Sequence, residues 1–386
     1  MGNAKAIDAE VLPDGIRSRF VEAVNGLRMH VLEAGFEIPG QPCVLLLHGF
    51  PELAYSWRKV MVPLAEAGFH VIAPDQRGYG RTTGDTPAYD VDLAPYNMIN
   101  LARDAMALLW ALGHRTTAAV IGHDFGASVA AYCALIRPDV FRAVVLMSAP
   151  FSGPPEFPFD TAAAGDRESN PAGSDIFADL ARLDPPRKHY HDYYSTRAAD
   201  RDMTHCPQGI SNFLRGYFHA KSADWAGNDP HPLAAWAAAD IAVMPTYYIM
   251  ERDKNMAETA AEFMPSAAEI ASCAWLDQRE IAFYAEEFGR TGFQGGLNWY
   301  RCRLDPAQTS ELRLFSGRTI DVPSCFIAGE KDWGVFQRPG ALEAMQTRAC
   351  TRMLDVHLLP GAGHWVQQEQ PAAVVDALTG FLSRAA

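Results

Sequence analysis

The sequence predicts an α/β protein whose mostly parallel central sheet is flanked by helices and interrupted once by an inserted, mainly helical cap. Strand-like and helix-like runs alternate up to Pro150, stop there, and resume at Asp321 after a long helical, aromatic-rich stretch. We therefore predict three segments, which are residues 1–150 (first part of the core), 151–320 (hinge and cap, or lid) and 321–386 (second part of the core).

The first core segment begins with strand signals. The run FVEAVNGLRMHVLEAG alternates on both sides of Asn25-Gly26, which predicts a hairpin with a tight turn. The runs CVLLLHG (residues 43–49) and HVIAPDQRGYG (residues 70–80) begin with apolar stretches of the kind found in strands buried on both faces. They predict central, parallel strands.

A helix is predicted next, because Leu101, Ala105, Leu108 and Leu112 fall on one helical face and Gly113 ends the pattern.

The second core segment repeats the strand and helix signals. Strand-like runs occur in DVPSCFIAGEKDWG and MLDVHLLPGAGHW, and PAAVVDALTGFLSRA predicts a closing helix.

The run AAVIGHDFGASVAAY (residues 118–132) predicts a strand that turns abruptly into a helix at Asp124. Glycines stand where larger side chains would clash, and the middle residue of such a turn is exposed and strained. In esterases and lipases this residue is a nucleophilic serine. Here a carboxylate occupies the position of the nucleophile.

Polar residues directly follow the predicted strands. Active groups of open parallel sheets gather at the carboxyl ends of the strands. The residues found there are His48, Asp75, Asp124, Asp332 and His364. Asp124, Asp332 and His364 stand in the chain order nucleophile, acid, histidine, which indicates a catalytic triad.

An aspartate nucleophile implies a particular reaction. Asp124 is already an anion at neutral pH, so it attacks a saturated carbon without a base and forms an ester. His364, oriented by Asp332, then activates a water that attacks this ester. We expect the backbone amides of Phe50 and Phe125 to stabilise the oxyanion that forms.

Five motifs match a known family. They are HGFPE (48–52), GHDFGA (122–127), AGEKDWGV (328–335), GAGHW (361–365) and, in the cap, FYAEEFGRTGFQGGLNWYR (283–301). With these motifs the chain resembles the epoxide hydrolases, the carboxylate-nucleophile branch of the α/β-hydrolase fold. The resemblance implies a hydrolase acting on ether bonds, which converts an epoxide and water into a vicinal diol.

The resemblance also implies two cap tyrosines that act as acids toward the epoxide oxygen. Tyr284 matches the second by its place in the cap motif. The first lies in RKHYHDYYST, where Tyr193 aligns best and Tyr190 and Tyr194 remain alternatives.

We expect Glu52, Trp333 and Tyr247 to contact substrate. Since the sequence has no run of convergent basic residues at the site, we expect that substrate to be a neutral, apolar epoxide.

Two other functions stay open at this point. One is a haloalkane-type dehalogenase with the same nucleophile, although Phe125 and Glu52 occupy the positions where halide donors are needed. The other is a catalytically weak member that binds a small ligand, for which an intact triad is unnecessary.

Composition and charge argue against several classes of binding partner. The formal charge of −13 argues against nucleic acid. The N-terminal run MGNAKAIDAEVLPDG lacks a signal region and no apolar run approaches a membrane span, so we expect a cytoplasmic protein. Seven cysteines without a CxxC pair suggest no zinc site, and we expect neither metal nor cofactor. The oligomeric state is open, with a homodimer among the alternatives.

Overall fold

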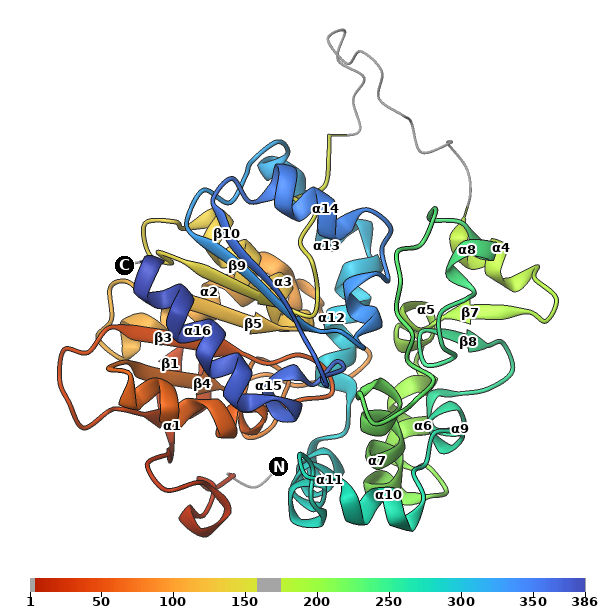
Figure 1. The fold of residues 1–386 in the computed structure, drawn as a ribbon, viewed down its shortest axis with the longest axis horizontal. Coiled ribbons are helices and arrows are strands. Elements are labelled where there is room, and N and C mark those ends of the chain that lie inside the picture. The colour runs from red at the N-terminus through yellow and green to blue at the C-terminus, as the bar shows by residue number, and fades with distance from the viewer. Residues whose placement is uncertain (1–3, 158–174, 386) are drawn as a thin grey trace, which may run out of the picture.

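A computed structural model describes residues 4–157 and 175–385. Its centre is an eight-stranded sheet in the order β1-β2-β4-β3-β5-β6-β9-β10 (Figure 1). The strands are β1 Arg17–Val24, β2 Leu27–Ala34, β3 Cys43–Leu47, β4 His70–Pro74, β5 Ala119–His123, β6 Val144–Met147, β9 Ser324–Gly329 and β10 Met353–Leu359.

The sheet is antiparallel only at the edge that β1 and β2 form. β1 pairs antiparallel with β2, and β2 pairs antiparallel with β4. From β4 to β10 all neighbouring strands run parallel. All residues of β3 and β5 are buried, which explains their nearly continuous apolar sequence. The predicted mostly parallel α/β sheet is confirmed.

The predicted hairpin joins β1 to β2. Val24 pairs with Leu27, and the two residues between them have φ values of 48° at Asn25 and 85° at Gly26. Both values lie in the left-handed region, which the tight hairpin turn requires and which Asn-Gly adopts readily.

Helices cover both faces of the sheet (Figure 1). α1 (Arg58–Glu66) and α16 (Pro371–Ala385) lie on one face, whereas α2 (Met98–Ala111) and α3 (Phe125–Ile136) lie on the other. The apolar face predicted for α2 is buried at Leu101, Ala105 and Leu108. Short helices α14 (Ala341–Ala344) and α15 (Val366–Glu369) complete the second core segment.

The segment between β6 and β9 holds most of the remaining helices, and we call its described residues 175–320 the cap. They lie beside the sheet rather than on its faces (Figure 1). The helices are α4 Ile176–Ala181, α5 Tyr190–Tyr194, α6 Ala198–Thr204, α7 Gly209–Lys221, α8 Ala238–Ile241, α9 Met256–Ala261, α10 Ala267–Ser272, α11 Gln278–Thr291, α12 Gln294–Leu304 and α13 Pro306–Thr309.

Two short antiparallel strands, β7 (Arg187–His189) and β8 (Ile249–Glu251), also lie in the cap. At three residues each they are too short to produce an alternating pattern, so the sequence gives no sign of them. Much of the predicted hinge lies outside the described residues, and the division at 150 and 320 stays a prediction. No helix in the described ranges is long and apolar enough to cross a membrane.

Candidate active site

Asp124 stands on the predicted strand-to-helix turn. β5 ends at His123 and α3 begins at Phe125, and Asp124 between them has φ 52° and ψ −120°. Such backbone strain costs on the order of 1–3 kcal/mol and is common at functional sites. The turn also needs its glycines, since a Cβ on Gly122 would lie 2.1 Å from the Gly126 carbonyl oxygen.

The structure brings Asp124, Asp332 and His364 together from the ends of β5, β9 and β10. His364 Nε2 lies 3.4 Å from Asp124 Oδ2, and His364 Nδ1 lies 3.0 Å from Asp332 Oδ1. The Gly334 amide donates to the same Asp332 oxygen at 2.7 Å. Asp332 is therefore fixed, and it orients the imidazole toward Asp124.

Charges around the triad set its protonation. Burial by itself would raise the pKa of Asp124, but the hydrogen bond and charge of His364 and the charge of Lys221 hold that pKa well below its usual range. Burial would lower the pKa of His364, but Asp332 and Asp124 outweigh it and raise the pKa to about 9. Asp124 is therefore an anion beside an imidazolium when no substrate is bound.

The Phe50 amide faces the nucleophile, as predicted. It donates to Asp124 Oδ1 at 3.0 Å, so this oxygen is held while Oδ2 faces His364. The backbone at Gly49 lies against the side chain of the nucleophile, because a Cβ on Gly49 would lie 2.4 Å from the Asp124 Cβ. The amide of Phe125, the second predicted donor, begins α3 directly after the nucleophile.

Glu52 does not face substrate, contrary to our expectation. It is completely buried and its Oε2 lies 2.5 Å from His123 Nδ1. The other His123 nitrogen, Nε2, lies 2.7 Å from the His364 carbonyl oxygen, and Gln367 donates to Glu52 Oε1 at 3.0 Å. Glu52 therefore supports the loop that carries His364.

A cavity of about 220 Å³, which we call the Asp124 cavity, lies beside the nucleophile between core and cap. Its walls include Phe125 from the core and Tyr190, Tyr300, Arg303 from the cap. Trp333 and Tyr247, which we expected to contact substrate, are not among its lining residues, and their contact with substrate stays a prediction. Tyr247 instead donates to Asn228, and the Trp333 ring lies against His231.

The predicted cap acids Tyr193 and Tyr284 do not reach the Asp124 cavity in this structure. Tyr193 Oη donates to Asp202 at 3.2 Å, and Tyr284 Oη lies 2.7 Å from Ser56 Oγ. The sequence motifs predicted where Tyr193 and Tyr284 lie along the chain, but they did not predict the direction of either side chain. Their role as acids stays a prediction that requires the hydroxyls to turn toward Asp124.

Tyr190 and Tyr300 line the cavity instead. Tyr190 Oη donates to Gln337 at 3.2 Å, whereas the Tyr300 hydroxyl has no hydrogen-bond partner among the described residues. Burial and the negative charge of Asp124 raise the pKa of both phenols well above the ordinary value. Both are therefore neutral donors. The sequence indicated Tyr190 as an alternative, whereas it did not single out Tyr300.

Sequence reasoning missed Lys221, a buried cation near the triad. Its Nζ lies 4.6 Å from the ring centroid of Tyr248 and 5.0 Å from that of Tyr217. It contributes to lowering the pKa values of both Asp124 and His364. No sequence signal marks a lysine at a helix end as buried, so only the fold reveals it.

One cluster of possible metal ligands lies away from the site. Cys325, Asp355 and His357 place ligand atoms within 4.8 Å of one another. The Asp355 carboxylate already forms an ion pair with Arg384, so the cluster offers no free carboxylate to a cation.

Comparisons with known proteins identify the family of this chain. The family model described as alpha/beta hydrolase fold matches residues 42–371. Epoxide hydrolase A of Mycobacterium tuberculosis (strain ATCC 25618 / H37Rv) is 34% identical over 93% of this chain and 95% of its own length. An epoxide hydrolase of Caballeronia sordidicola is 31% identical over 93% of this chain and 92% of its own.

Solved structures give the same result. An epoxide hydrolase from an endophytic Streptomyces superposes with a TM-score of 0.75 at 30% identity, covering 96% of each chain. Epoxide hydrolase A from Mycobacterium thermoresistibile superposes with a TM-score of 0.71 at 33% identity, covering 95% of this chain and 98% of the other. The predicted fold and family are confirmed, and the chain belongs to the epoxide hydrolases of the α/β-hydrolase fold.

Proposed function

We propose that this chain hydrolyses an epoxide to a vicinal diol through a covalent ester on Asp124. The observation that carries the proposal is the strained Asp124, whose two oxygens are separately engaged by the Phe50 amide and His364. Serine nucleophiles suit carbonyl substrates, whereas a preformed carboxylate suits displacement at a saturated carbon. We also propose that residues 151–320 act as a lid over the core segments 1–150 and 321–386.

In the first step Asp124 Oδ2 attacks an epoxide carbon and the carbon–oxygen bond of the ring breaks. The ring oxygen stays attached and takes a proton from an acid, for which a neutral tyrosine in the cavity is suited. Tyr300, whose hydroxyl has no other partner among the described residues, and Tyr190 occupy the right cavity. We therefore assign the role of acid to Tyr190 and Tyr300. Tyr193 and Tyr284 can take this role only if their hydroxyls turn toward Asp124.

In the second step a water attacks the ester carbonyl carbon. His364 takes the proton of this water, and Oδ1 becomes the oxyanion that the Phe50 amide already contacts. The bond between Asp124 Cγ and Oδ2 then breaks, and the proton held by His364 passes to Oδ2. Oδ2 therefore leaves as a hydroxyl of the diol, and the water oxygen takes its place in the Asp124 carboxylate. One substrate turnover in labelled water therefore places label in the Asp124 carboxylate.

Ester formation prepares His364 for its role as base. In the free site the Asp124 charge helps to raise the pKa of His364 to about 9. The ester is neutral, so this contribution is lost and the imidazolium gives up its proton more readily. This proton replaces the one that the cavity tyrosine gave to the ring oxygen. The base is thus generated when it is needed.

A product assay tests this function against dehalogenation. Purified protein is incubated with styrene-type and aliphatic epoxides and with matched haloalkanes, and diol and halide are both measured. We expect diol from epoxides, no halide, and no turnover by Asp124→Ala. Halide release without diol, or turnover by Asp124→Ala, contradicts the proposal.

A further inference from the structure

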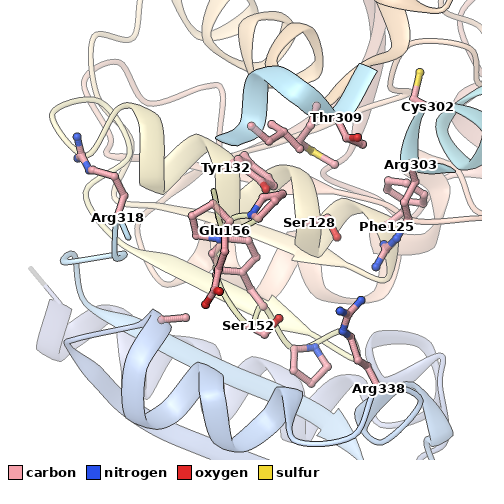
Figure 2. A pocket seen from close by; sticks show the side chains of 18 of the residues that line it. Phe125, Ser128, Tyr132, Ser152, Glu156, Cys302, Arg303, Thr309, Arg318 and Arg338 are labelled. Atoms are coloured by element: carbon pink, nitrogen blue, oxygen red, sulfur yellow. The ribbon is translucent and has the colours of Figure 1, made fainter. Parts of the chain in front are cut away.

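Two arginines from distant parts of the sequence line the cavity that holds Asp124. Arg303 lies near the end of α12, and Arg338 follows β9 in the core. Both also line an adjoining outer cleft of about 530 Å³, so they stand where the two spaces meet. Figure 2 shows their guanidinium groups pointing toward one another.

Arg303 and Arg338 are both exposed, and neither guanidinium is neutralised by a carboxylate of the described residues. Other arginines are paired, such as Arg77 with Asp104 at 2.7 Å and Arg81 with Glu287 at 2.8 Å. Within the described ranges Arg303 and Arg338 form no ion pair or side-chain hydrogen bond. Their recorded neighbours are aromatic, with Arg303 lying 5.8 Å from the ring centroid of Phe125.

The charges of Arg303 and Arg338 repel each other. Partial desolvation in the cleft and the charge of Arg303 both lower the pKa of Arg338. Burial and the same Arg303 charge lower the pKa of the cavity residue His189 to about 3. The one carboxylate that lines the Asp124 cavity is Asp124 itself, among the described residues.

The positive character is local, because the whole chain has a formal charge of −13. Among the described residues, the charged side chains that line the outer cleft are Arg348 and, labelled in Figure 2, Arg303, Arg318, Arg338 and the single acid Glu156. A cleft with such an excess of cations in an acidic protein attracts anions and repels cations.

We propose that the substrate is an epoxide that carries a carboxylate, with its ring at Asp124 and its carboxylate between Arg303 and Arg338. The inference rests on the epoxide hydrolysis proposed above. A planar guanidinium matches a carboxylate with two parallel N–H donors, and two such groups offset the repulsion from Asp124.

This proposal replaces the expectation of a neutral, apolar epoxide. That expectation relied on a site without convergent basic residues. Arg303 and Arg338 are far apart in the sequence and converge only through the fold, so the sequence alone did not reveal them at the cavity.

The test is a series of terminal epoxyalkanoates that differ in the number of methylenes between ring and carboxylate. Each acid is paired with its N-methylamide, which has nearly the same shape and no charge. We expect kcat/KM for the best acid to exceed that of its amide by at least about 10-fold, since charge-assisted hydrogen bonds are worth that much or more. The variants Arg303→Gln and Arg338→Gln should each reduce this acid-to-amide ratio by about 10-fold.

Arg142→Gln is the matched control, because Arg142 is exposed and outside both cavities. It should keep the acid-to-amide ratio of the unmodified protein. An acid-to-amide ratio near one, or a ratio that neither arginine variant changes, overturns the inference while diol formation preserves the proposed function. If neither acid nor amide gives any diol, the proposed function itself fails.

Discussion

Replacing Asp332 by Asn removes the charge that orients and supports His364. Asp332 is buried, contacts His364 Nδ1 at 3.0 Å and accepts the Gly334 amide at 2.7 Å. Asn retains an acceptor for Gly334, so the loop should keep its shape. Its NH₂ group, however, favours the imidazole tautomer whose Nδ1 accepts and whose Nε2 can no longer act as the base.

The structure gives the size of the effect. Burial acts to lower the pKa of His364, and Asp332 is the main cause of its rise from 6.5 to about 9. Since one pKa unit is about 1.4 kcal/mol, this rise corresponds to roughly 3 kcal/mol of support for the imidazolium, or 10² to 10³-fold in rate. Water activation should slow by this factor, whereas attack by Asp124 should change little because it needs no base.

The assay follows the protein mass after rapid mixing with an epoxide. Asp332→Asn should form the ester at nearly the normal rate and lose it slowly, and the hydrolysis step should reach half its maximum at lower pH. Asp321→Asn, an exposed carboxylate just before β9, is the control and should behave normally. If Asp332→Asn slows ester formation and hydrolysis equally, or hydrolyses the ester at the normal rate, the reasoning is refuted.

Three further variants test individual contacts. Tyr300→Phe should slow ring opening by about 10²-fold in single-turnover kinetics while Tyr193→Phe stays near normal; the reverse result would restore the assignment from family resemblance. Glu52→Gln should lower the free energy of urea unfolding by about 1–3 kcal/mol, because it weakens the buried hydrogen bonds that Glu52 forms with His123 and Gln367; an unchanged free energy of unfolding would contradict the supporting role. Lys221→Met should raise the pKa of His364 and shift the base-dependent limb of kcat to higher pH, since Lys221 acts to lower that pKa; an unchanged pH profile would show that Lys221 only packs.

The sequence predicted the fold well because its signals are local. Apolar strands such as Cys43–Leu47 can be distinguished from amphipathic helices such as Met98–Ala111 by the spacing of their apolar residues. The triad was predictable for a related reason. Parallel strands end at one edge of the sheet, so residues that follow different strands, Asp124 and His364 among them, meet there.

Side-chain direction and long-range convergence were not predictable in this way. Tyr190 and Tyr193 lie on the same helical turn, but only Tyr190 lines the Asp124 cavity, because the packing of α5 decides which face turns inward. Glu52 lies only two residues after the oxyanion donor Phe50, yet its side chain turns into the core toward His123. Arg303 belongs to the cap and Arg338 to the core, so no local pattern connects them.

The central claim is that Asp124 forms a covalent ester that His364 clears. The most direct measurement is the intact mass of His364→Gln after incubation with a good epoxide substrate. Without its base, ester hydrolysis should slow by about 10² to 10⁴-fold. The protein should gain the mass of one whole substrate molecule, since ring opening expels no fragment, on the peptide that contains Asp124. Hydroxylamine should remove this adduct, and Asp124→Ala should never form it. Normal turnover by His364→Gln, or an adduct on Cys133 or any other residue, would show that Asp124 is not the nucleophile.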